Sequence, residues 1–149
     1  MREKTTLPKT PLVLAKDDPV VDIHIPSGGP LTPEICDRDI ALGEDIFCKS
    51  FGDFKAFVCQ SWLLDVNLEK ILGKKTNITR FGDRFTRYPF KSNGADVYEY
   101  VFMQPSDTPP DKLNIKNSFA KTIQKHLAGG GHIYGAGGIF LPRRINKCL

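Results

Sequence analysis

The stretch Val20–Glu34, VVDIHIPSGGPLTPE, carries the strongest structural signal in the chain. Its first residues are rich in β-branched side chains, which favour a strand leading to Ser27. Gly28 and Gly29 follow, and the absence of their side chains lets an anion approach main-chain N–H groups. The stretch therefore predicts a strand followed by a phosphate cradle, although Gly-Gly-Pro also occurs in plain strand-to-helix turns.

A helix start follows the glycines. Thr32 is a suitable N-cap, Pro33 suits the first turn, and Glu34 stands where an acidic group opposes the helix dipole. Apolar residues then recur at near-helical spacing as far as Phe51, before the sequence Gly52-Asp53. We expect one helix over 33–51.

Size and charge limit the class of protein. The chain has 149 residues and 40% hydrophobic content, which is enough for the core of a single globular domain. Its net charge of +4 comes from 21 basic and 17 acidic residues that are scattered along the sequence. This mild, scattered charge argues against a dedicated nucleic-acid binder.

The cysteines and the N-terminus bear on location. Cys36, Cys48, Cys59 and Cys148 form no Cys-x-x-Cys motif, and the first residues lack the apolar run of a signal peptide. No apolar segment approaches the length that spans a membrane. We expect free thiols in a cytoplasmic protein that does not bind membranes; two disulfides in a secreted protein are the alternative.

Three regions are expected along the chain. Residues 1–19, with three prolines among charged residues, are predicted to be an extended lead-in or linker. Residues 20–142 are predicted to form the folded domain, and residues 143–149 a basic tail.

Strands and helices are expected to alternate at first, with two consecutive strands later. A strand over 54–59 and a short helix before Gly73 are expected next. Strands over 76–88 and 96–103 are then expected to pair as an antiparallel hairpin, with a bulge at Gly82. The last elements are a helix through Phe119, Ile123 and Leu127 and a glycine-rich strand or hairpin over 132–141. The expected order is β-α-β-α-β-β-α-β, an α/β fold with a mixed sheet.

This order resembles the second half of the GNAT acyltransferase fold. Four motifs are more specifically similar to the GNAT-like C-terminal domain of two-domain bacterial acyltransferases, over about residues 20–141. The motifs are HIPxGGPL at 24–31, FVCxSWLLD at 57–65, NIxxF at 77–81 followed by Arg84 and Phe85, and GGH at 130–132 followed by Gly135-Ala136-Gly137. The resemblance implies a GNAT-like half fold.

The resemblance also implies a cofactor and a reaction. Acetyl-CoA or another acyl-CoA would bind where the first two strands separate, and the acyl group would pass directly to an unidentified small-molecule amine. By position, residues 23–25 and 58–61 would line the two walls of that gap. The implied cofactor-binding residues are Ile25, Ser27, Gly28, Gly29, Leu31, Thr32 and Cys59.

A complete GNAT unit needs further strands and helices before the ones found here. The resemblance therefore implies a partner, either a missing N-terminal domain or a second copy of the chain. The alternative function is a non-catalytic scaffold or interaction module that packs on such a partner.

Three residues are candidates for catalysis. His24 is a candidate general base because histidine titrates near neutrality, although a structural histidine in a strand is the alternative. Ser61 would bond a substrate amide or cap the helix that Trp62 begins. Tyr98, or Tyr100 on the same predicted strand face, would protonate the leaving thiolate or simply pack in the sheet.

Cys59 is expected to be an inert core cysteine rather than a nucleophile, because apolar surroundings suppress the thiolate. Neither His24 nor His132 stands near a second ligand at metal-binding spacing, so no metal site is expected.

Polar residues of the predicted 76–88 strand leave two interpretations open. Arg80 and Arg84 would share a strand face and meet an acidic substrate or a cofactor phosphate. The alternative is a solvated face or a contact with the missing domain, and it applies equally to Asn77 and Arg87.

Overall fold

The computed structural model describes residues 14–26 and 28–142 of the chain. Most of the predicted lead-in, Ser27 and the predicted basic tail lie outside the described residues. Within the described part, four strands form one sheet in the spatial order β1-β2-β4-β3. The strands are β1 (Val20–Asp22), β2 (Ala56–Ser61), β3 (Thr86–Pro89) and β4 (Ala136–Phe140). Because β2 runs parallel to β1 and antiparallel to β4, the predicted α/β fold with a mixed sheet is confirmed.

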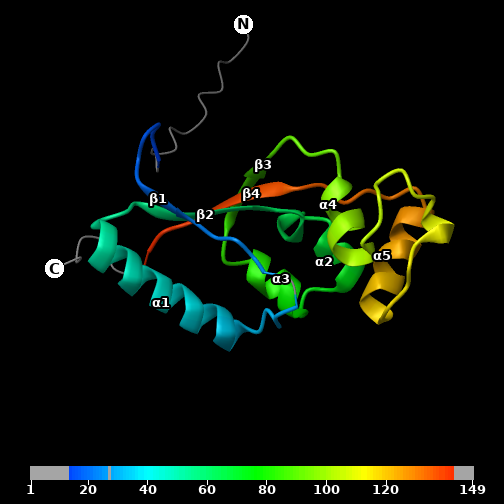
Figure 1. Ribbon diagram of the computed structural model, residues 1–149, viewed down its shortest axis with the longest axis horizontal. Coiled ribbons are helices and arrows are strands. Elements are labelled where there is room, and N and C mark those ends of the chain that lie inside the picture. Colours follow the sequence, from blue (N-terminus) through cyan, green and yellow to red (C-terminus); the bar gives the residue numbers. More distant parts are fainter. Residues whose placement is uncertain (1–13, 27, 143–149) are drawn as a thin grey trace, which may run out of the picture.

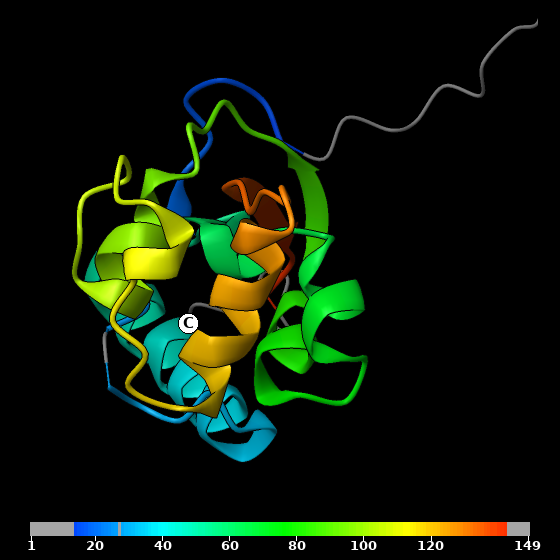
Figure 2. The same cartoon turned by 90° about the vertical axis from the view of Figure 1, so that its right-hand side faces the viewer.

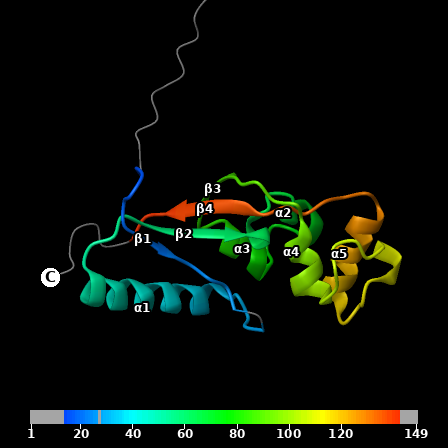
Figure 3. The ribbon, with the colours of Figure 1, turned by 45° about the horizontal axis from the view of Figure 1, so that its top comes forward.

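Helix α1 (Pro33–Phe51) has the bounds that the sequence predicts. Thr32 Oγ1 accepts a hydrogen bond from the N–H of Ile35 at 3.4 Å, and Pro33 occupies the first turn. The helix connects the parallel strands β1 and β2 and runs along one face of the sheet (Figures 1 and 3). It therefore begins at the end of β1, directly after the glycine loop.

A core of apolar side chains lies between the sheet, α1 and helix α3 (Asn77–Gly82). Its buried members are Cys36, Cys59, Leu64, Phe81 and Phe85. Gly138 of β4 belongs to this packing, since a Cβ on it would lie 2.8 Å from the Cβ of Phe85. The glycine thus lets an aromatic ring rest directly on the sheet.

A second core lies around α5 (Ser118–Ala128). Figure 2 shows this helix with shorter helical segments on either side of it. The second core gathers side chains from several short helices: η1 (Trp62–Leu64), α2 (Leu68–Leu72), α4 (Ala95–Val97) and η2 (Tyr98–Phe102), with η3 (Pro110–Lys112) preceding α5. Asn117 caps α5 by accepting the N–H of Ala120 at 2.8 Å. Ile123 and Leu127 are buried in this core, so the predicted last helix is confirmed.

The predicted strand over 76–88 is wrong in its first half, which forms α3. Thr76 caps this helix by accepting the N–H of Thr79 at 3.2 Å, and the Thr79 hydroxyl donates to the Gly73 carbonyl at 3.1 Å. These local side-chain bonds hold residues of high strand propensity in a helical turn. Gly82 ends α3 and forms no bulge, and the strand begins only at Thr86.

The predicted strand over 96–103, and the hairpin that contained it, are also wrong. Residues 95–102 form α4 followed by the wider, π-type turns of η2. Asn93 accepts the N–H of Ala95 at 3.0 Å ahead of the helix, and Val97 and Phe102 are buried in the second core. The order of strands and α-helices is therefore β-α-β-α-α-β-α-α-β.

The cysteines only partly follow the prediction. Cys36 and Cys59 are free, whereas Cys48 is disulfide-bonded, so the expectation of free thiols is wrong there. Spacing rules detect only short motifs, and this bond leaves no such signal in the sequence. None of the helices in the described part is long and apolar enough to cross a membrane.

Candidate functional site

The strands β1 and β2 pair at their beginnings and separate toward their ends. Residues 20–22 lie opposite residues 56–58, and Ile23 donates its N–H to the Val58 carbonyl at 2.8 Å. Beyond that bond, no backbone hydrogen bond joins the two segments within the described residues. A gap therefore opens between residues 23–26 and the end of β2, at the place that the resemblance to the GNAT fold implies.

Gln60 presents its main chain to this gap. Main-chain groups alternate sides along a strand, so Gln60 faces the same way as Val58, which bonds Ile23. Gln60 has no backbone partner on that side in the described part of the chain. The gap thus offers one N–H donor and one carbonyl acceptor to an extended ligand.

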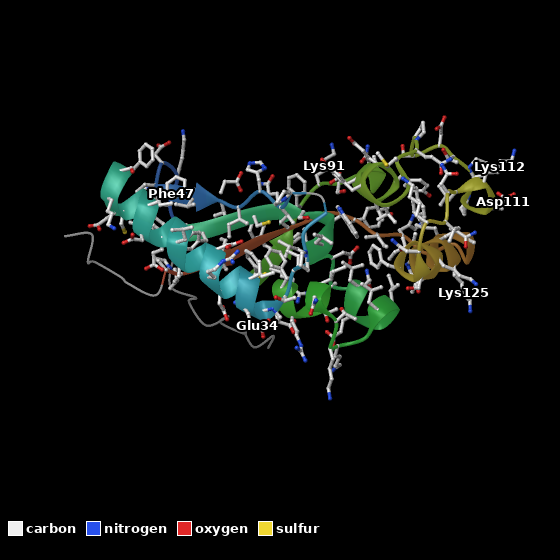
Figure 4. All side chains as sticks on the ribbon, turned by 60° about the horizontal axis from the view of Figure 1, so that its bottom comes forward. Glu34, Phe47, Lys91, Asp111, Lys112 and Lys125 are labelled. Carbon is white, nitrogen blue, oxygen red and sulfur yellow. The ribbon has the colours of Figure 1, made fainter. Side chains whose placement is uncertain are left out.

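The glycine loop lies at the start of α1. Gly28 has a φ of +91°, a conformation that residues with a Cβ rarely adopt. The N–H groups of Gly28, Gly29 and Leu31 donate to no acceptor among the residues described. They lie close to the first turn of α1, which Figure 4 marks at Glu34, where the helix dipole attracts an anion. Ser27, also predicted for this cradle, lies outside the described residues.

A cavity of about 720 Å³ lies between the glycine loop and the short helices of the second core. Residues 23–26 and 28–31 form one side, and residues 59–63 form another. The far side consists of Asn77, Ile78, Asp96, Tyr100, Asn117 and Phe119. Its volume is in the range of small-molecule sites. Among the predicted cofactor-binding residues, those on its walls are Ile25, Gly28, Gly29, Leu31 and Cys59, whereas Thr32 caps α1.

His24 lies on the wall of this cavity and is open to solvent. Its side chain is 92% exposed, and its Nε2 lies 3.2 Å from Oδ2 of Asp22. The interpretation of His24 as a histidine packed within a strand is therefore wrong, because β1 ends at Asp22 and the His24 side chain points to solvent while its neighbours Ile23 and Ile25 pack against the core. The imidazole is accessible for proton transfer.

Ser61 and Tyr98 lie in different surroundings. The Oγ of Ser61 accepts a hydrogen bond from the N–H of Leu63 at 3.1 Å and so caps η1. Ser61 also lines the cavity. Tyr98 packs against the second core and is not on the cavity wall, whereas Tyr100 is. Since this segment is helical, the two tyrosines do not share a strand face, which corrects the prediction.

Cys59 has the properties of an inert core cysteine. It is 1% exposed, and burial raises the pKa of its thiol to about 11, with the charge of Asp22 adding to the shift. Burial also raises the pKa of the Cys36 thiol. At neutral pH neither group is a thiolate nucleophile.

The arginines do not form the shared face that the sequence suggested. Arg84 Nη1 lies 2.5 Å from Oδ1 of Asp37, and its Nη2 donates to the Pro33 carbonyl at 3.1 Å. Arg84 therefore joins the turn after α3 to the beginning of α1. Arg80 is exposed on α3, and Arg87 pairs with Asp83 at 2.9 Å. None of these three arginines lines the cavity.

Several residues on the cavity wall were not predicted. Asp96 and Tyr100 stand one turn apart on a segment that the sequence predicted as a strand, and Asn117 and Phe119 begin α5. The helical spacing of Val97 and Val101 was the signal for the first pair. His126 and His132 lie elsewhere, with His126 Nε2 at 3.3 Å from the His132 carbonyl. In the described ranges, no group of three metal-ligating side chains was found.

The sequence of the chain matches a family model over residues 1–140, and that family is described as the GNAT-like C-terminal domain. The chain belongs to this family. Among curated proteins, no significant match was found.

Solved structures of acyltransferases are similar to the chain. One, in complex with decanoyl-CoA, is 30% identical with a TM-score of 0.73, and the match covers 87% of this chain and 42% of that one. A second, with decanoyl-CoA and teicoplanin, is 27% identical with a TM-score of 0.70, covering 81% and 40%. A third holds CoA and 10C-teicoplanin, at 27% identity and a TM-score of 0.69, with 81% and 40% covered. The chain thus spans about 40% of the length of these proteins.

Proposed function

We propose that the chain binds an acyl-CoA between β1 and β2 and that the acyl group is transferred directly to an amine. One observation carries this proposal: parallel strands separate beside a glycine loop with free N–H groups at a capped helix start. Acyl-CoA and CoA are the ligands of similar acyltransferases, which supports the choice of ligand.

The residues present suit the parts of such a ligand. The loop N–H groups of Gly28, Gly29 and Leu31 suit a pyrophosphate, and the main chain of Gln60 suits the amides of a pantetheine arm. Apolar side chains on the cavity wall suit an acyl chain: Ile25, Trp62, Leu63, Ile78 and Phe119. The chain length accepted is proposed to include the ten carbons bound by the similar acyltransferase.

When bound, an acyl-CoA supplies an activated thioester whose carbonyl carbon bonds to the amine nitrogen as the carbon–sulfur bond breaks. His24 takes the proton that the amine loses, because its imidazole lines the cavity and is open to solvent. Asp22 orients that ring from 3.2 Å. Tyr100 would supply the proton that a leaving thiolate needs, because it lines the cavity whereas Tyr98 does not.

A second domain is proposed to cover part of this chain. Helix α1 exposes Leu42, Ile46 and Phe51, and Phe47 lies beside β1 (Figure 4), where it lines a mostly apolar cavity of about 330 Å³. The span of about 40% against the similar acyltransferases agrees with a missing partner domain. A second copy of the chain is the other candidate partner, and the cytoplasmic location stays a prediction.

Isothermal titration of the 149-residue chain with decanoyl-CoA and with CoA tests the proposal. We expect both to bind with one site per chain, and decanoyl-CoA to bind more tightly because its tail buries apolar surface. Absence of binding by either would leave the non-catalytic module as the function. Transfer to amines is then measured as free thiol released from decanoyl-CoA.

A further inference from the structure

The far side of the cavity holds a carboxylate that the proposed function does not use. Asp96 lies on α4, one helical turn before Tyr100, and both face the cavity from the side opposite the glycine loop. Amide side chains of Asn77 and Asn117 belong to the same side. The cavity therefore has two chemically different ends, one with main-chain donors and one with side-chain acceptors.

The Asp96 carboxylate is available to a ligand. Asp96 is half-buried and has no hydrogen bond or ion pair with any described residue. The other described acidic residues that are buried or half-buried have partners: Asp65, for example, accepts the N–H groups of Asn67 at 2.8 Å and Tyr134 at 2.6 Å. A half-buried carboxylate without such partners gains most from a cationic or hydrogen-bond-donating ligand.

The charge on the cavity wall has one sign. The chain carries 21 basic residues and a net charge of +4, yet no lysine or arginine of the described part lines this cavity. Lys112 and Lys125, for example, point outward at the far end of the molecule (Figure 4). Apart from His24, Asp96 is the only acidic or basic side chain among the residues on the described walls. The far end thus favours a cation against the overall charge of the protein.

We propose that Asp96 binds the ammonium group of the acceptor, with the Tyr100 hydroxyl as a neighbouring hydrogen-bond acceptor. The proposal rests on the proposed function and gives its acceptor a class: a primary amine that is cationic near neutral pH. Asp96 is a binding residue in this scheme. It holds the ammonium at the end opposite the glycine loop. The ammonium releases one proton to water before it attacks, and His24 takes the second proton, which the nitrogen loses as the carbon–nitrogen bond forms.

Trp62 provides the readout. It is the only tryptophan of the chain, it is 8% exposed, and it lines the same cavity. Titrations of its fluorescence use n-butylamine, its uncharged analogue 1-butanol and decanoyl-CoA as three separate probes. In the unmodified chain we expect n-butylamine to give a saturable change that weakens as salt is raised, and 1-butanol to give a smaller change.

Asp96→Asn removes the charge without changing the size of the side chain. We expect it to weaken n-butylamine binding by about tenfold or more and to leave decanoyl-CoA binding unchanged. Glu99→Gln is the matched control: it removes the same charge from an exposed neighbour that does not line the cavity. Circular dichroism and the thermal midpoint show whether both variants fold.

Each outcome separates the inference from the function on which it rests. No response to n-butylamine, an equal response in Asp96→Asn, or an equal loss in Glu99→Gln overturns the inference. A loss of decanoyl-CoA binding alone in Asp96→Asn also overturns it, because Asp96 then belongs to the donor. If decanoyl-CoA fails to bind while n-butylamine binding depends on Asp96, the cation site stands and the proposed function fails.

Discussion

Ile23 donates its main-chain N–H to the carbonyl of Val58 at 2.8 Å, and this bond is the last one between the parallel strands β1 and β2 within the described residues. Beyond it the two segments separate, and the unused main chain of Gln60 faces the space between them. The glycine loop follows within a few residues along the chain. The position of this one bond therefore sets where an extended ligand can add itself to the sheet.

A valine at Gly28 should weaken CoA binding without unfolding the chain. Gly28 has a φ of +91°, and no atom lies within 4 Å of the position that a Cβ would occupy. The substitution strains the backbone by on the order of 1–3 kcal/mol and pushes a side chain into the proposed cradle. We expect CoA affinity to fall by about tenfold or more in calorimetric titrations.

Gly52→Val is the matched control for that experiment. Gly52 has a φ of +83° and equally open surroundings, but it lies at the opposite end of α1. Both variants should lose similar stability in urea, whereas only the one at Gly28 should lose CoA affinity. Equal affinities in the two variants would show that the loop does not touch the ligand.

Replacing Arg84 by methionine should destabilise the fold. The guanidinium lies 2.5 Å from Asp37 and bonds the Pro33 carbonyl at 3.1 Å, so it holds the first turn of α1 against the turn after α3. Its side chain is 22% exposed, and methionine keeps the apolar stem. We expect a loss of about 1–3 kcal/mol in the free energy of unfolding, measured in urea.

The exposed ion pair of Arg38 and Asp39 provides the control for the Arg84 substitution. Arg38 is 72% exposed, and its replacement by methionine should change stability by less than about 0.5 kcal/mol. If the two methionine variants were equally stable, Arg84 would not have the anchoring role described above.

Native Cys59 should resist alkylation by iodoacetamide. Because burial raises the pKa of its thiol to about 11, the thiolate is about one part in a thousand at pH 8. The reaction should therefore accelerate as the pH rises toward 11, and in urea Cys59 should react at the rate of an ordinary cysteine. Peptide mass spectrometry gives the extent of labelling; rapid labelling at pH 8 in the folded chain would contradict the burial.

The raised pKa of Cys59 should make the free energy of unfolding fall at high pH. The folded state favours the neutral thiol, so its contribution is complete below the ordinary pKa of 9.0 and is lost as the pH rises from there toward 11. Urea titrations at pH 8 and pH 10 should show the loss, and Cys59→Ala should reduce it.

Sequence patterns predicted the elements whose signals are local and agree with one another. Thr32 and Pro33 mark the start of α1, and the spacing of Phe119, Ile123 and Leu127 marks the amphipathic helix α5. The gap between β1 and β2 was expected from the resemblance to the GNAT fold and not from these local signals, which mark only the glycine loop and the helix start after β1.

The two errors have a common cause. Residues 77–82 and 95–102 are rich in β-branched and aromatic side chains, which suggested strands. The Thr76 cap, the bond that the Asn93 side chain accepts from the N–H of Ala95, and burial in the cores make both segments helical. Asp96 and Tyr100 were consequently not expected on the cavity wall, since a strand would have placed them elsewhere.

An amide NMR titration of the ¹⁵N-labelled chain with decanoyl-CoA tests the central claim most directly. If the ligand binds between β1 and β2, the signals of Gly28, Gly29, Leu31 and Gln60 should shift together and saturate at one equivalent. Shifts confined to Lys121, Lys125 and His126, which line a basic groove between α2 and α5, would contradict the claim. So would the absence of any shift at saturating ligand.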